Sequence, residues 1–118
     1  MSRRFVLPGP EVGRLMLDRL IAEGVRYGRD FAVVRISLPL GSADAVAPLL
    51  SACLRDADVI VRWEADELLA LLPATDRPGA ERAAQRLREA VDIDMALGAA
   101  HWVGDTAYDL LARAEPRR

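Results

Sequence analysis

Three carboxylates lie within four consecutive residues of the chain, Glu64-Ala65-Asp66-Glu67. Carboxylates grouped in this way can hold a divalent cation, and such ions support phosphoryl transfer. Short apolar segments flank the group on both sides, which predicts that it forms the tight turn of a β-hairpin. Because exposed turns tolerate charge, we expect a solvated acidic turn here and no metal site.

Other catalytic chemistries are excluded by the residue types that are present. The chain has no Lys, which a Walker A loop requires for its phosphates, and a single His, which is too few for a histidine-rich metal site. The only cysteine, Cys53, allows no internal disulfide and is expected to be an unreactive residue of the core. His101 is expected to have a structural role or to lie exposed at a strand end. These residues predict no cofactor.

Length and composition indicate one soluble globular domain. The chain has 118 residues, of which 52% are hydrophobic and 29% charged, with a formal net charge of -2. This balance predicts no nucleic-acid partner, and no apolar run is long enough to span a membrane. The start of the chain does not resemble a signal peptide, so the cytoplasm is the expected compartment. We expect one domain over 1–118, with an N-terminal segment and helix (5–28) before a core (31–115).

Hydrophobic periodicity predicts the order helix, strand, helix, hairpin, helix, strand, helix. Such a βαββαβ order is typical of an α+β fold, the ferredoxin-like palm, in which helices flank an antiparallel sheet. The predicted ranges are a helix from Pro10 that frays at Gly24, a strand at 31–38, a helix at 43–54 with Pro48 in its first turn, hairpin strands at 59–63 and 68–72, a helix at 76–91, a strand at 93–100 and a helix at 106–114.

Apolar residues at helical spacing predict which helix faces are buried. In the first helix they are Val12, Leu15, Met16, Leu20 and Ile21. In the second helix they are Val46, Leu49, Leu50 and Cys53.

The segment Arg62 to Pro73 resembles the signature hairpin of GGDEF domains, the diguanylate cyclases. That signature reads Arg, aromatic, Gly, Gly, Asp or Glu, Glu, Phe, and continues as an apolar strand that ends in Pro. Further similarity extends over Ala84-Gln85-Arg86-Leu87-Arg88 and over Ala96-Leu97-Gly98-Ala99-Ala100. The resemblance implies a palm domain of bacterial cyclic di-GMP signalling.

Departures from the family pattern concern the synthetic site. Glu64 and Ala65 replace the glycine pair, and Glu64 adds negative charge where a triphosphate would lie. The family carries a metal-binding acid at the end of the first strand, where we align Ser37 and Pro39. Asp44 matches the family's guanine-binding Asp, but the chain has no Asn or Lys to complete that site. We therefore expect a degenerate domain that is not an enzyme and has no catalytic residues.

A second site of the family binds cyclic di-GMP through an Arg-x-x-Asp motif just before the hairpin. Arg55-Asp56-Ala57-Asp58 matches this motif at the family's spacing, and Arg86 lies where some members supply a second arginine. Guanidinium groups bind phosphates or guanine edges, and the Asp58 carboxylate can accept hydrogen bonds from guanine. The alternative is that Arg55 and Asp58 only end a helix and begin a strand.

A regulatory module that binds cyclic di-GMP, a protein partner or both is the function that the resemblance implies. The competing hypothesis is an interaction or dimerisation scaffold with no nucleotide ligand. Trp63, Trp102 and Tyr108 are its candidate anchors, because aromatic residues are enriched at interfaces, although core packing would also explain them.

Overall fold

A four-stranded antiparallel sheet forms the centre of the protein in the computed structural model, which describes residues 5–118. The strand order is β2-β3-β1-β4, and every neighbouring pair is antiparallel. The expected α+β palm is therefore confirmed. In chain order the elements are α1 (Pro10–Tyr27), β1 (Phe31–Ser37), α2 (Ala43–Ser51), β2 (Val59–Glu64), β3 (Glu67–Pro73), α3 (Arg77–Ala90), β4 (Ala96–His101) and α4 (Ala107–Arg113).

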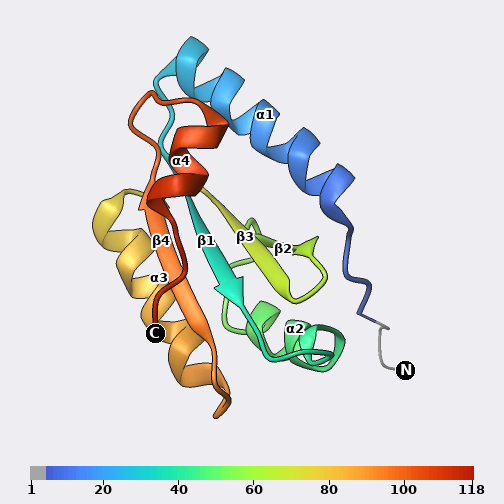
Figure 1. Ribbon diagram of the computed structural model, residues 1–118. Helices are drawn as coiled ribbons and strands as arrows, with labels where there is room; N and C mark the ends of the chain where they lie inside the picture. Colours follow the sequence, from blue (N-terminus) through green and yellow to red (C-terminus); the bar gives the residue numbers. More distant parts are fainter. Residues whose placement is uncertain (1–4) are drawn as a thin grey trace.

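The helices cover both faces of this sheet, with α1 and α4 on one side and α2 and α3 on the other (Figure 1). Residues of a strand alternate between faces. Ala32, Val34 and Ile36 of β1 accordingly join the core beneath α2 and α3. Phe31 and Val33 join the core beneath α1 and α4. Odd-numbered residues of β1 thus face α1 and α4.

Helix α1 packs on the sheet through two glycines as well as through apolar residues that its periodicity singles out, since Met16, Leu20 and Ile21 lie against the core as predicted. A Cβ on Gly13 would lie 2.6 Å from Val61 Cγ2, and one on Gly24 would lie 2.4 Å from the Trp102 ring. Both glycines are buried within the helix, so the prediction that it frays at Gly24 is wrong. Val12 and Leu15, predicted inward, are exposed, because the close approach at the glycines turns that side of the helix outward.

The second helix is shorter than predicted and buries fewer of its apolar residues. It ends at Ser51, with Pro48 in its second half and not in its first turn. Cys53 lies beyond its end and is only half-buried. Leu49 is exposed, since only Ala43, Val46, Ala47 and Leu50 of the helix face the core. The strand predicted from residue 93 begins at Ala96.

Strand β3 separates the two regions that the sequence singles out. Its first residue, Glu67, belongs to the acidic hairpin. Its last residue, Pro73, leads into the loop before α3, next to the segment that holds Arg55 and Asp58. At about 3.3 Å per residue, the strand places the two regions about 20 Å apart. Among residues 5–118, no helix is long and apolar enough to cross a membrane.

Candidate functional site

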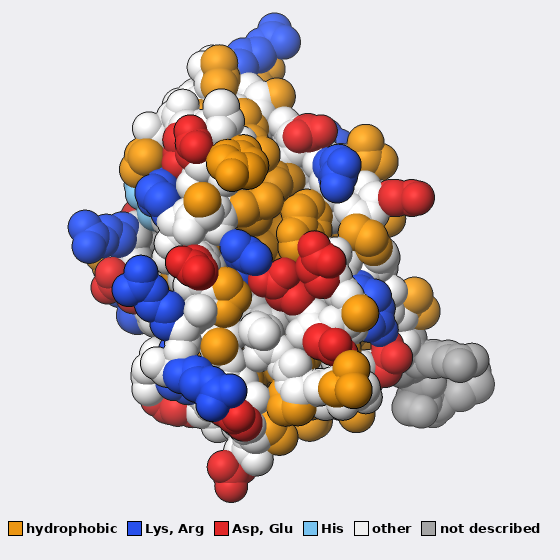
Figure 2. Space-filling model, in the orientation of Figure 1, with side chains coloured by type: hydrophobic (Ala, Val, Ile, Leu, Met, Phe, Trp, Pro, Cys, Tyr) orange, Lys and Arg blue, Asp and Glu red, His pale blue; other side chains and the backbone are white. Residues whose placement is uncertain are grey.

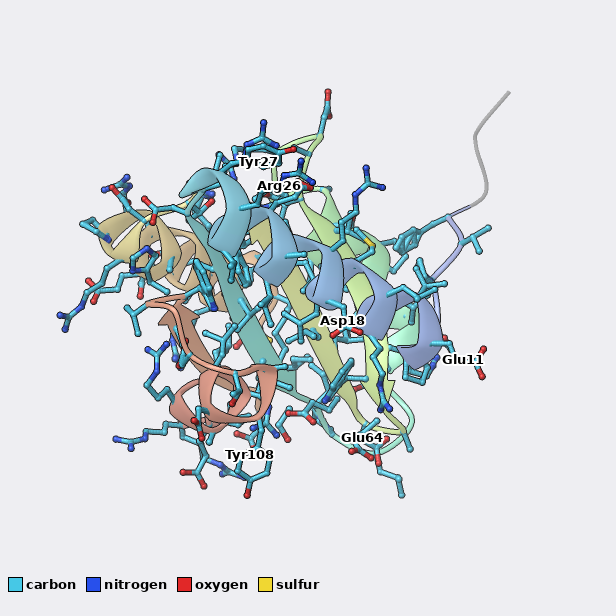
Figure 3. The ribbon with its side chains drawn as sticks, turned by 90° about the horizontal axis from the view of Figure 1, so that it is seen from above. Glu11, Asp18, Arg26, Tyr27, Glu64 and Tyr108 are labelled. Atoms are coloured by element: carbon cyan, nitrogen blue, oxygen red, sulfur yellow. The ribbon has the colours of Figure 1, made fainter. Side chains whose placement is uncertain are left out.

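The acidic hairpin is a tight turn whose three carboxylates point in different directions. Glu64 pairs with Glu67 across the turn. Asp66 is turned toward the loop after β1, where its Oδ1 accepts a hydrogen bond from the Gly41 backbone nitrogen at 3.1 Å. Glu64 is exposed and projects outward from the hairpin, as Figure 3 shows.

Arg35 is the residue of β1 that meets the hairpin, and the sequence analysis missed it. Its Nε donates to Glu67 Oε1 at 2.9 Å, and its Nη1 donates to the Leu111 carbonyl oxygen of α4 at 3.0 Å. Ser37, one of the two positions aligned with the family's first-strand acid, is the cross-strand neighbour of Glu67 but is exposed, as is Pro39. The odd-numbered residues of β1 and β3 share the face beneath α1 and α4, and the register of the two strands brings Arg35 next to Glu67.

A shallow pocket of about 840 Å³ lies beside the hairpin. It is lined by the hairpin itself, by Arg35 and Ser37, and by the C-terminal segment around Glu115. Figure 2 shows acidic side chains gathered on this face below an apolar hollow, with a basic side chain beside them. The metal ion that the family implies does not fit this set of donors, because one carboxylate is bonded to a guanidinium and another to a backbone nitrogen. Asp44, the candidate guanine contact, is bonded to Arg62.

The predicted Arg-x-x-Asp motif forms a compact ion pair in the loop between α2 and β2. The Asp58 side chain is 1% exposed, and its carboxylate accepts hydrogen bonds from the Arg55 backbone nitrogen, Nε and Nη2 at 2.8–3.1 Å. The hydrogen bond to Asp58 raises the pKa of the Arg55 guanidinium, more than its partial burial lowers it. Asp58 therefore orients Arg55, whose side chain is half-exposed.

Thr75 and the end of β3 provide further hydrogen-bond acceptors for Arg55. Its Nη2 also donates to the Pro73 carbonyl oxygen and to the Thr75 hydroxyl, both at 2.7 Å. Between them lies Ala74, whose φ of 49° is the one positive value among the described non-glycine residues. Alanine in this left-handed region is strained, and strained residues persist where the surrounding structure fixes them. The loop thus holds the guanidinium at a defined position.

A pocket of about 920 Å³ brings Arg55, Asp58 and Arg86 together. Arg86 comes from α3, and the pocket also includes Arg82 one helical turn earlier and Arg29 from the loop after α1. The sequence analysis did not identify Arg29, Arg82 or Thr75. The signal for Arg82 was its position four residues before Arg86, which places the two on the same face of a helix.

A comparison with protein families gives a match over residues 44–114 to the family described as "Diguanylate cyclase, GGDEF domain". The match includes the hairpin, the Arg-x-x-Asp motif and the helix that carries Arg86. This chain belongs to the GGDEF family, and hence to the proteins of cyclic di-GMP signalling. A comparison with curated proteins gives no match.

Solved structures of GGDEF proteins share the fold at low identity. The diguanylate cyclase SiaD of Pseudomonas aeruginosa, solved with its activator SiaC, matches with a TM-score of 0.80 and 19% identity. That match covers 92% of this chain but only 52% of the SiaD chain, so this chain spans about half of that protein. The FimX GGDEF domain of Pseudomonas aeruginosa gives a TM-score of 0.80 and 17% identity, covering 97% and 90% of the two chains.

The GGDEF domain of DgcB from Caulobacter crescentus, solved in complex with cyclic di-GMP, gives a TM-score of 0.75 and 16% identity. This match covers 98% of the present chain and 89% of the DgcB chain.

The family match corrects one expectation of the sequence analysis. We predicted that the chain is not an enzyme, and this is wrong for the class of protein, because the matched family is that of the diguanylate cyclases. Solved structures of the same fold include such a cyclase. The departures at Glu64 and Ala65 therefore do not remove the domain from a cyclase-type enzyme family.

The aromatic residues proposed as interface anchors lie in different settings. Trp102 is buried, stacks on Phe31 at 5.5 Å between ring centroids and belongs to the core. Trp63 is partly buried against the same core. Tyr108 is 82% exposed and projects from α4, as Figure 3 shows.

Proposed function

We propose that this GGDEF domain is a cytoplasmic regulatory module that binds cyclic di-GMP in the pocket lined by Arg55, Asp58 and Arg86. The observation that carries the proposal is the convergence of these residues. They come from two separate segments of the chain, and they line one pocket of about 920 Å³. We infer that this pocket, at the end of β3 remote from the hairpin, is the ligand site.

The chemistry of the pocket suits a doubly anionic guanine nucleotide. Arginine binds phosphate oxygens through paired hydrogen bonds and stacks on planar bases, so Arg55, Arg82 and Arg86 offer both kinds of contact. Arg55 is held by Asp58, by Pro73 and by Thr75 before any ligand arrives. A side chain that is already ordered loses less conformational entropy on binding, and the affinity is correspondingly higher.

Asp58 has a different role in this proposal from the one that the sequence suggested. Its carboxylate is covered by Arg55 and 1% exposed, which leaves little of it for a guanine base. We assign it the orientation of Arg55. Phosphate contacts then come from the guanidinium groups. The DgcB domain, which has the same fold and was solved with cyclic di-GMP, supports the choice of ligand.

Calorimetric titration with cyclic di-GMP tests the proposal. The wild-type domain is expected to bind saturably, and Arg86→Ala is expected to weaken binding by about tenfold to a hundredfold, because a hydrogen bond to a charged group contributes about 1.5–3 kcal/mol. Arg88→Ala is the matched control. It removes an exposed arginine of the same helix that does not line the pocket, and it should leave the affinity unchanged.

Absence of heat at high ligand concentration would refute the proposed site. Equal losses of affinity in Arg86→Ala and Arg88→Ala would show a general charge effect, which also contradicts a specific site. Arg86 is the better first target, because Arg55 is bonded to three parts of the fold and its removal also affects stability.

A further inference from the structure

Arg35 and Glu67 form an ion pair on the face of the sheet that α1 and α4 cover. The side chains are 24% and 11% exposed, and the nitrogen–oxygen distance is 2.9 Å. The guanidinium also bonds the Leu111 carbonyl oxygen near the end of α4. One cation therefore joins three segments that are far apart in sequence, namely β1, the hairpin and α4.

Oxygen ligands for a divalent cation are not assembled around this pair. Magnesium and manganese require several anionic or carbonyl oxygens converging on one point. Among residues 5–118, no three His, Cys, Asp or Glu side chains are grouped to hold a metal ion. Any ion at Glu67 would also lie beside the fixed positive charge of Arg35, which repels it.

We propose that the Arg35 guanidinium neutralises the charge of Glu67 in place of a divalent metal ion and fastens the hairpin to α4. Arginine suits this role because its planar fork donates in two directions at once, through Nε to the carboxylate and through Nη1 to the carbonyl. The hairpin is then held in place without metal. The proposal concerns cation binding and is independent of the cyclic di-GMP pocket at the other end of β3.

Titration with MnCl₂, followed by the paramagnetic broadening of backbone amide signals, tests this inference. In the wild-type domain, the amides of residues 64–68 are expected to keep their intensity at Mn²⁺ concentrations that saturate ordinary protein sites. In Arg35→Asp, a second carboxylate faces Glu67 and the guanidinium is gone. Saturable broadening of the same amides is expected there, and an excess of MgCl₂ should reverse it.

Arg88→Asp is the matched control, since it makes the same change in net charge at an exposed position of α3. It should not broaden the hairpin amides. Site-specific broadening in the wild-type domain would overturn the proposal, and this measurement needs no variant. A folded Arg35→Asp domain that gains no Mn²⁺ site would also overturn it, because the guanidinium would then not be what excludes the ion. Should Arg35→Asp fail to fold, Arg35→Gln is the second variant. Its amides at residues 64–68 are expected to exchange hydrogen faster than in the wild-type domain, because the hairpin is no longer attached to α4. Unchanged exchange would overturn the proposal.

Discussion

Two arginine–carboxylate pairs lie at opposite ends of β3, and they differ in which partner is covered. At the hairpin, Arg35 and Glu67 are both largely buried, with side-chain exposures of 24% and 11%. In the pocket, Asp58 is 1% exposed whereas Arg55 is 50% exposed. The first pair is closed within the structure. The second is open, because a buried carboxylate orients an arginine whose side chain is half-exposed.

We propose that this difference separates a structural ion pair from an arginine that is ordered in advance for a ligand. A closed pair uses its charge for contacts within the fold, and removing one partner leaves an uncompensated buried charge. An open pair keeps part of its hydrogen-bonding capacity for a ligand, and the cost of ordering the arginine is met when the protein folds. Mutations in the first pair should therefore mainly change stability, and mutations in the second should change binding as well.

Arg35→Ala is expected to have the largest effect on stability. Loss of the guanidinium leaves Glu67 without its partner on a covered face, and we expect the free energy of unfolding to fall by about 3 kcal/mol. Urea denaturation followed by circular dichroism measures this change. Arg88→Ala serves as the control and should be nearly neutral. A loss below about 0.5 kcal/mol would show that the closed pair stabilises the fold no more than an exposed salt bridge does.

Asp58→Asn should have the next largest effect, and it should act on both properties. The substitution removes the charge that receives three hydrogen bonds from Arg55, so we expect a loss of about 2 kcal/mol in stability. The affinity for cyclic di-GMP should fall as well, because Arg55 is no longer oriented. Denaturation and calorimetry on one preparation measure the two effects. Unchanged affinity in a folded variant would contradict the orienting role.

Thr75→Val tests the orientation of Arg55 with a smaller change, the loss of one hydrogen bond. The hydroxyl of the buried Thr75 accepts a hydrogen bond from Arg55 Nη2, whereas valine fills the same volume without it. We expect a stability loss of about 1 kcal/mol and a several-fold weaker affinity for cyclic di-GMP, measured by the same calorimetric titration. A Thr75→Ser variant keeps the hydroxyl and should retain most of the affinity.

The ion pair of Asp105 and Arg113 lies outside both regions and serves as a reference for them. Its loss is expected to have the smallest effect on the free energy of unfolding. Burial opposes ionisation of Asp105, but the hydrogen bond from Arg113, the backbone hydrogen bonds and the Arg113 charge together outweigh it and lower the pKa of this carboxyl. A lowered pKa contributes stability that is present above the unfolded value of about 3.9 and is lost as the pH falls through the folded value. Asp105→Asn should therefore be less stable at neutral pH, and its difference from the wild-type domain should narrow below about pH 4. A constant difference across that range would contradict the assignment.

Much of the fold could be predicted from the sequence because its periodicities are local. The nearly continuous apolar run at 31–38 and the short apolar segments around the hairpin indicated the strands, and the order of elements indicated the palm. The buried side of α1 could be predicted only in part this way: Met16, Leu20 and Ile21 pack against the core, whereas Val12 and Leu15 are exposed. The rest of the contact depends on Gly13 and Gly24 meeting residues that are distant in sequence, and glycine carries no apolar signal.

The sites show the same division between local and long-range information. Arg55 and Asp58 lie three residues apart, so a short motif identified them, and the structure brings Arg86 to the same pocket. Arg35 was missed because its partners, Glu67 and Leu111, are 32 and 76 residues away. Only the antiparallel register of β1 and β3 brings that arginine to the hairpin.

Mapping of cyclic di-GMP by amide chemical shifts in the isotopically labelled domain tests the central claim most directly, because it reports on both ends of β3 at once. We predict saturable shifts in residues 55–58, in the loop 73–76 and in α3 around Arg82 and Arg86, with little change at residues 64–67. Shifts centred on the hairpin, or no shifts at saturating concentrations of ligand, would contradict the assignment of the open arginine–carboxylate pair as the ligand site.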